Sequence, residues 1–204
     1  MNIQKLKDII KNKAKEYAIP TQQLYDNFFF EQFLFRLSLS NYKNEFVLKG
    51  GFLLENITGV TNRSTLDIDF NYYQKGFSVD DLHNKISEVC EIKTDIEIIY
   101  KILSIEEINE EGDYLGYRIN ITAQYINLKK RFHIDVASGD RITPAPVLYR
   151  YNSIIDGHFN FEIMAYNKET ILAEKFQTII SRGASNSRSK DLYDIFTLAN
   201  DLSL

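Results

Sequence analysis

The chain has 204 residues and a formal net charge of −4, with 44% hydrophobic and 25% charged residues. These values are typical of one globular domain with a sizeable core, and they exclude a disordered or fibrous chain. The negative charge excludes a general attraction to nucleic acid, so a contact with RNA or DNA would need a local basic patch. A single cysteine, Cys90, excludes an internal disulfide. Without a signal peptide or an apolar run long enough to span a bilayer, we expect a cytoplasmic protein that makes no membrane contact.

The first 45 residues form a predicted helical lead-in. Apolar residues at helical spacing predict one amphipathic helix over residues 2–17, which Ile19-Pro20 ends. A second helix over residues 21–40 has a broad apolar face rich in phenylalanine, and we interpret this face as core packing.

The stretch 46–70 is predicted to be a strand, a short helix and a second strand. Residues 46–48 form the first strand, Gly50-Gly51 turns the chain into a helix over residues 52–57, and a polar loop leads to the second strand with Asp67 and Asp69. These two aspartates share one face, because successive strand side chains alternate between the faces of a sheet. Amides at a helix start, reached across glycines, can seat phosphate oxygens. A plain tight turn is the simpler interpretation of the glycine pair, which is neither a Walker A loop nor a Rossmann fingerprint.

Strands in the middle of the chain with helices at both ends predict an α/β or α+β domain over residues 46–204. Its mixed sheet is flanked by N- and C-terminal helices. The predicted elements are a helix over 80–92, strands over 96–108, 114–127, 132–137 and 159–165, and helices over 168–182 and 189–202. A loop holding Pro144 and Pro146 precedes the last strand. The apolar residues of the two closing helices are expected to face inward: Ile171, Leu172, Phe176, Ile179, Leu192, Ile195, Phe196 and Leu198.

A third strand carboxylate, Asp135, makes a metal site plausible. An Asp-x-Asp pair alone is usually two solvent-facing charges, but clustered carboxylates repel each other, and a cation offsets that cost. Mg²⁺ prefers oxygen ligands and binds through one or two carboxylates together with substrate phosphates. Asp67 and Asp69 would carry the ions, and Asp135 would serve as a ligand, a base, or both. His133 shares the polar face of its strand with Asp135, and we interpret it as a hydrogen-bonded residue instead of a zinc ligand.

These motifs, in their order along the chain, resemble the AbiEii/AbiGii toxin family of nucleotidyltransferases. The resemblance rests on Lys49-Gly50-Gly51, on the segment 63–69 that ends in Asp67-Ile68-Asp69, on Asp135, and on the segments 173–176 and 188–194. It implies the polymerase-β-like nucleotidyltransferase fold and transfer of a nucleoside monophosphate from an NTP with Mg²⁺ or Mn²⁺. Family members are toxins of bacterial toxin–antitoxin or abortive-infection systems that defend against phage, and characterised relatives modify tRNA 3′ ends.

The resemblance also implies roles for individual residues. Asp67, Asp69 and Asp135 match the metal-binding carboxylates, and Lys175 matches a lysine that contacts the triphosphate. The implied nucleotide-binding residues are Lys49, Gly50, Gly51, Arg63, Lys175, Lys190, Asp191 and Asp194. The implied partners are an NTP, an RNA acceptor such as tRNA, and a cognate antitoxin protein. Many members continue into a further helical bundle, whereas this chain stops soon after Asp194.

Two other interpretations remain open. A nucleotidyltransferase-like module could hold a nucleotide or a partner protein in a defence complex without turnover, although it would not need three carboxylates. A metal-dependent phosphodiesterase could use the same acids, but it needs an activated water where a transferase needs room for an acceptor hydroxyl.

Overall fold

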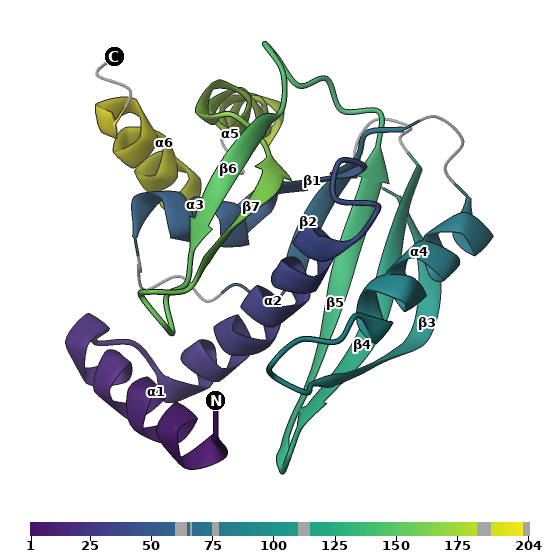
Figure 1. The fold of residues 1–204 in the computed structure, drawn as a ribbon. Helices are drawn as coiled ribbons and strands as arrows, with labels where there is room; N and C mark the ends of the chain where they lie inside the picture. The colour runs from purple at the N-terminus through teal and green to yellow at the C-terminus, as the bar shows by residue number, and fades with distance from the viewer. Residues whose placement is uncertain (60–64, 66, 75–77, 110–114, 183–188, 202–204) are drawn as a thin grey trace.

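The computed structural model describes residues 1–59, 65, 67–74, 78–109, 115–182 and 189–201 (Figure 1). Among these residues, no helix is long and apolar enough to cross a lipid bilayer. The helices are α1 (Ile3–Tyr17), α2 (Thr21–Leu39), α3 (Gly50–Thr58), α4 (Val79–Glu91), α5 (Lys168–Arg182) and α6 (Ser189–Asp201). The strands are β1 (Phe46–Lys49), β2 (Asp67–Tyr72), β3 (Ile99–Asn109), β4 (Leu115–Tyr125), β5 (Leu128–Ser138), β6 (Val147–Asn152) and β7 (Asn160–Ala165).

These strands form one mixed sheet in the order β3-β4-β5-β2-β1-β7-β6. The pairs β2–β5 and β1–β7 are parallel, and the other neighbouring pairs are antiparallel. The predicted α+β class with a mixed sheet flanked by helices is confirmed. The β2–β5 pair matters most for function, because it brings together two segments that are far apart in the sequence.

Helix α2 covers one face of the sheet and lies at the centre of the core (Figure 1). Its Phe30 and Phe33 rings pack against Phe132 of β5, with ring centroids 5.1 and 6.5 Å apart. Ile68 and Phe70 of β2 are also fully buried in this core. The opposite, polar side chains of β2 and β5 are thereby left for the other face of the sheet.

Helix α2 also buries polar side chains that tie it to other elements. Arg36 donates hydrogen bonds to the carbonyl oxygens of Cys90 and Ile98, at 2.5 and 2.7 Å. Asp26 forms an ion pair with Lys130 at 2.6 Å. The apolar pattern predicted a helix packed by phenylalanine. These partnered polar groups additionally fix its position over the sheet.

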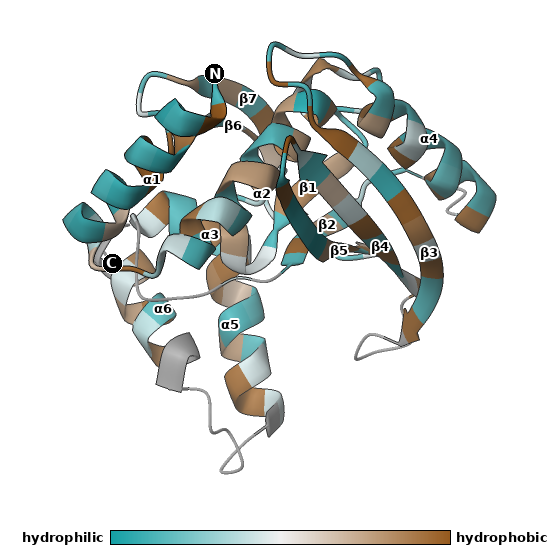
Figure 2. Ribbon diagram, turned by 90° about the horizontal axis from the view of Figure 1, so that it is seen from below, coloured by the Kyte–Doolittle hydropathy of each residue, from teal (hydrophilic) through white to brown (hydrophobic). Residues whose placement is uncertain are grey.

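Helix α1 confirms the predicted amphipathic pattern. Leu6 and Ile10 are buried, while Lys5, Lys7, Lys11 and Lys15 are exposed, and Figure 2 shows the helix as largely hydrophilic. Burial of the apolar stripe is sufficient to explain the pattern, so the lysine face is a solvated surface.

Strand β6 was not predicted, because the segment after Pro144 and Pro146 was expected to be a loop. It is an edge strand in which Tyr151 alone is fully buried, so its sequence lacks the alternation of a half-buried strand. Strand β5 also begins earlier than expected, at Leu128. The basic residues Lys129 and Lys130 therefore belong to the hairpin with β4.

The prediction that the apolar residues of α5 and α6 all face inward is wrong in part. Ile171, Leu172 and Leu198 are buried, but Phe176, Leu192 and Phe196 are 50%, 61% and 66% exposed. Helices α5 and α6 pack against each other and α6 contacts α3. Helical periodicity identifies an apolar face but does not reveal whether another element covers it.

Candidate active site

The polar face of the sheet brings four titratable side chains together at the β2–β5 junction. In the parallel register Asp67 lies opposite His133, and Asp69 lies opposite Asp135. Residues in register on neighbouring strands project to the same face, so all four side chains belong to one surface. The structure thus places the three aspartates predicted from the sequence on one face, where Asp67 and Asp135 belong to a group of converging ligand atoms and Asp69 does not.

Asp67, His133 and Asp135 can offer one ligand atom each, and these atoms lie within 4.8 Å of one another. The nearest ring nitrogen of His133, Nε2, is 3.4 Å from Oδ2 of Asp67. Two carboxylates and an imidazole fit Mn²⁺, and two carboxylates completed by substrate phosphates fit Mg²⁺. His133 was expected to be a hydrogen-bonded residue and not a metal ligand. The signal that points to His133 is the His-x-Asp spacing on a strand that pairs in register with Asp67-Ile68-Asp69.

Arg118 of β4 is a member of the site that sequence reasoning missed. Its guanidinium donates from Nε to Oδ1 of Asp135 at 2.8 Å and from Nη2 to Oδ2 at 2.7 Å. Arg118 and Asp135 are directly opposite in the antiparallel β4–β5 pair. The hydrogen bonds to Asp135 raise the pKa of Arg118, and both oxygens of the buried carboxylate are engaged. In the sequence, Arg118 is one polar residue of an alternating strand, which carries no signal for this pairing.

Gly50 makes room for Asp69. Helix α3 begins at Gly50, two residues earlier than predicted, with φ at +73°. A Cβ atom at this position would lie 1.9 Å from Oδ2 of Asp69, far inside van der Waals contact. The carboxylate therefore lies against the first residue of the helix, where the helix dipole favours a negative charge. A side chain at residue 50 would displace it.

Lys49 precedes this helix and is opposite Asp69 in the β1–β2 register. Its ammonium forms an ion pair with Asp140 at 2.6 Å, and the same carboxylate oxygen accepts a hydrogen bond from the Tyr166 hydroxyl at 2.8 Å. The ion pair with Asp140 thus fixes the position of Lys49, the lysine predicted to contact nucleotide, on the strand next to Asp69.

The C-terminal residues predicted for the site lie on α5 and α6. Lys175 of α5 and Asp194 of α6 form an ion pair at 3.0 Å, and both side chains are largely buried. Lys190 and Asp191 belong to the first turn of α6, but their side chains lie outside the described residues, as does Arg63.

Cys90 is unsuited to nucleophilic chemistry. Burial raises the pKa of its thiol to about 12, so the reactive thiolate is scarce at neutral pH. Cys90 is a partly buried residue that packs against the core.

Solved structures share the fold of this chain. The structure of JHP933 from Helicobacter pylori superposes with a TM-score of 0.56 at 16% identity, over 89% of this chain and 68% of that one. A putative nucleotidyltransferase from H. pylori gives a TM-score of 0.53 at 17% identity, over 88% and 68%. A comparison with curated proteins finds no match. The fold, with its clustered acids on the sheet, is that of a nucleotidyltransferase.

The family follows from the sequence model described as nucleotidyl transferase AbiEii toxin, type IV toxin–antitoxin system, which matches residues 32–204. The chain belongs to this AbiEii family, and its activity is nucleotidyl transfer. The resemblance found in its motifs is therefore confirmed over most of the chain.

Proposed function

We propose that the chain is a toxin that uses a divalent ion, Mg²⁺ or Mn²⁺, to transfer a nucleoside monophosphate from an NTP to an acceptor hydroxyl on RNA. A tRNA 3′ end is the proposed acceptor, a cognate antitoxin protein the proposed inhibitor, and the bacterial cytoplasm the proposed location. The observation that carries this proposal is the grouping of Asp67, His133 and Asp135 on one sheet face, with Asp69 beside them at the start of α3.

The residues present fit a divalent ion. Asp67, Asp135 and His133 would hold it, and Asp69 adds a fourth group in register with Asp135. When bound, such an ion neutralises phosphate charge and lowers the pKa of an attacking hydroxyl. Without an ion, the repulsion among the carboxylates is reduced by Arg118, which lies on Asp135.

The other residues proposed for the site act on the triphosphate. The amides at the start of α3, around Gly50 and Gly51, suit phosphate oxygens because the helix dipole is positive there. Lys175 would act as a point cation on the triphosphate, with Lys49, Arg63 and Lys190 as further cations. Asp191 and Asp194 complete the proposed nucleotide-binding set on α6.

Asp135 is the proposed base for the acceptor hydroxyl. Arg118 donates one hydrogen bond to each of its oxygens, and each oxygen keeps a second lone pair that can face the acceptor hydroxyl. Asp135 would hold a cation in competition with the Arg118 guanidinium, whose charge also suits a phosphate of the RNA backbone.

The proposal is tested by incubating each of the four α-³²P-labelled NTPs with total tRNA and Mg²⁺ or Mn²⁺. We expect the label on RNA from at least one NTP, and transfer reduced by more than about a hundredfold in Asp67→Asn, which lacks a metal-ligating charge. The matched control is Asp80→Asn, because Asp80 is an exposed acid in the first turn of α4. Expression of the wild type, but not of Asp67→Asn, should inhibit bacterial growth.

One observation favours the alternative of a module that binds without turnover: the Arg118 guanidinium donates to both oxygens of Asp135, the proposed base. A binding module would retain NTP, as equilibrium dialysis would detect, but leave no label on RNA with any of the four NTPs. Label on protein alone would point to a protein acceptor. Release of labelled nucleotide without any transfer would favour a phosphodiesterase.

A further inference from the structure

A cavity of about 310 Å³ lies between α2, the N-terminal segment, the connection from α4 to β3, and the β6–β7 connection. Its volume is in the range of small-molecule sites. None of its described lining residues belongs to the cluster of Asp67, Asp69, His133 and Asp135. The nucleotidyl-transfer site therefore does not account for this cavity.

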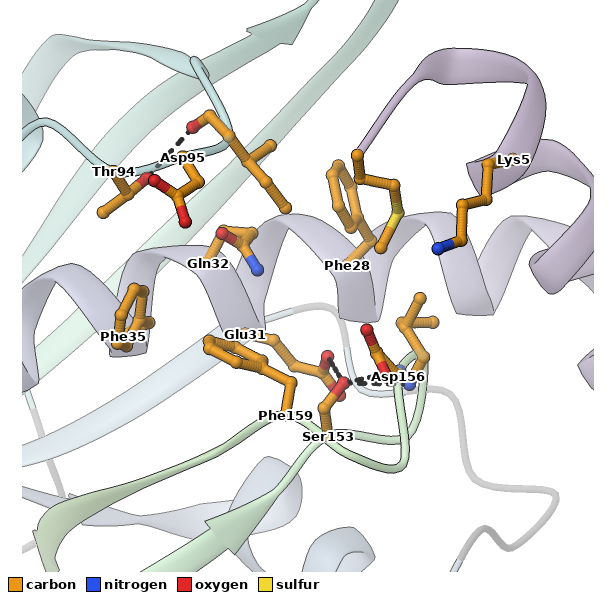
Figure 3. Close-up of a pocket in the computed structure, with 13 residues that line it drawn as sticks. Lys5, Phe28, Glu31, Gln32, Phe35, Thr94, Asp95, Ser153, Asp156 and Phe159 are labelled. Atoms are coloured by element: carbon orange, nitrogen blue, oxygen red, sulfur yellow. Dashed lines mark hydrogen bonds between the residues drawn. The ribbon is translucent and has the colours of Figure 1, made fainter.

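Gln32 is the most informative residue of the cavity wall. Its side chain is 6% exposed, yet it has no hydrogen-bond partner within the described part of the chain. Its amide atoms are not fully enclosed and remain accessible from the cavity, where water can satisfy them. Figure 3 shows Gln32 in the middle of the wall, with Thr94 and Asp95 on one side and Glu31 on the other. Its amide offers both a donor and an acceptor to a bound molecule.

The cavity wall carries both acidic and basic groups. Glu31, Asp95 and Asp156 line it, together with Lys5 and the N-terminal residue Met1, which carries the α-amino group. Glu31 already accepts hydrogen bonds from the Ser153 hydroxyl at 2.5 Å and the Ile154 amide at 2.7 Å. Asp95 and Asp156 are therefore the acids best able to pair with a ligand. Their carboxylates offer partners to a cationic group of a bound molecule.

Aromatic rings supply the apolar part of the wall. Phe28, Phe35 and Phe159 line the cavity, and the rings of Phe35 and Phe159 meet edge to face with centroids 4.8 Å apart. Phenylalanine rings pack against an apolar ligand and also attract a cation to their faces. The wall thus combines a place for an apolar group with a place for a positive charge.

We propose that this cavity binds a small organic amine, with a protonated amino group joined to an apolar or aromatic body. The amino group donates to the carbonyl oxygen of Gln32 and pairs with Asp95 or Asp156, and the body packs among Phe28, Phe35 and Phe159. The site is separate from the proposed nucleotide site and does not depend on it.

The test measures binding of phenethylamine to the full chain by titration in NMR, with phenethyl alcohol and 3-phenylpropanoate as the neutral and anionic analogues. We expect saturable binding of the amine, and at least fivefold weaker binding of both analogues. Gln32→Leu keeps the size of the side chain but removes the amide, and it should weaken amine binding by about tenfold to a hundredfold, as expected for a hydrogen bond to a charged group.

Asp95→Asn provides a second variant in an exposed connection, where loss of folding is not expected. It should weaken amine binding and reduce its dependence on salt concentration. Glu162→Gln, at an exposed acid of β7, is the matched control and should bind the amine as the wild type does. Equal affinity for phenethylamine and phenethyl alcohol, or unchanged affinity in both Gln32→Leu and Asp95→Asn, would overturn the proposal.

Discussion

At the scale of single residues, the geometry around Asp69 depends on the absence of a side chain at residue 50. The positive φ of Gly50 and the 1.9 Å approach of Asp69 to a hypothetical Cβ are separate constraints. The chain offers controls that separate them. Gly59 has a φ of +86° with open space around its hypothetical Cβ, and Gly157 likewise has open space but no positive φ.

We predict that Gly50→Ala lowers the free energy of unfolding by more than Gly59→Ala, and that only Gly50→Ala impairs divalent-ion binding. Backbone strain alone costs about 1–2 kcal/mol for a left-handed residue, and the collision with Asp69 adds to it. Gly157→Ala should have little effect. Urea unfolding and Mn²⁺ titration measure the two quantities. Equal losses of stability and ion affinity in Gly50→Ala and Gly59→Ala would show that contact with Asp69 is unimportant.

Arg118 gives a second prediction at this scale. Because its guanidinium competes with a cation for both oxygens of Asp135, Arg118→Met should bind Mn²⁺ more tightly, by about tenfold at low salt. Electron paramagnetic resonance of free Mn²⁺ measures the affinity directly, without any measurement of transfer activity. The control is Arg150→Met, at an exposed arginine of β6. Weaker ion binding in Arg118→Met would mean that Arg118 positions Asp135 and does not compete for it.

At the scale of elements, Glu31 joins α2 to the β6–β7 connection. Its carboxylate accepts from the Ser153 hydroxyl and the Ile154 amide, and burial raises its pKa to about 7 from an ordinary value of 4.5. Because the folded state holds this proton more tightly than the unfolded state, the stabilisation is complete below pH 4.5 and is lost as the pH rises through 7.

We predict that the wild type loses stability relative to Glu31→Gln between pH 4.5 and 8, by an amount on the order of 3 kcal/mol. Glutamine can still accept from the Ile154 amide but does not titrate. The difference in unfolding free energy between the two proteins, measured in urea at several pH values, isolates this group from the others. A difference that stays constant with pH would contradict the assigned burial effect.

The two C-terminal helices show another limit at the element scale. Their lengths and apolar spacing agree with the prediction, but the side chains of Phe176, Leu192 and Phe196 are at least half exposed. Apolar residues at every third or fourth position mark one apolar face of a helix. This spacing does not identify which element, if any, packs against that face.

At the scale of the whole molecule, the cluster of acids couples ion binding to stability. An ion that binds only the folded chain at a hundred times its Kd stabilises it by about 2.7 kcal/mol. For a protein of this size, that corresponds to a rise in Tm of about 5–10 °C. We predict this rise with Mn²⁺ for the wild type but not for Asp67→Asn, measured by circular dichroism. An equal rise in both proteins would place the bound ion elsewhere.

Much of the fold could be predicted because it depends on local periodicity. The helices near Ile3–Tyr17, Thr21–Leu39 and Val79–Glu91 and the alternating strands β4 and β5 follow from the spacing of their apolar residues. Strand β6 could not be predicted, because only Tyr151 among its side chains is buried and the apolar alternation is absent.

The sequence by itself determined that Asp67 and Asp69 share a strand face, that Gly50-Gly51 starts a helix, and that the ordered motifs belong to a nucleotidyltransferase. Local geometry suffices for the first two, because side-chain direction on a strand and backbone freedom at glycine are local properties. Only the tertiary structure decided that β2 and β5 pair in parallel, which brings His133 and Asp135 to Asp67 and Asp69. It alone placed Arg118 on Asp135 and Gln32 in a cavity, because contacts between segments distant in sequence depend on strand pairing and helix packing that no local pattern specifies.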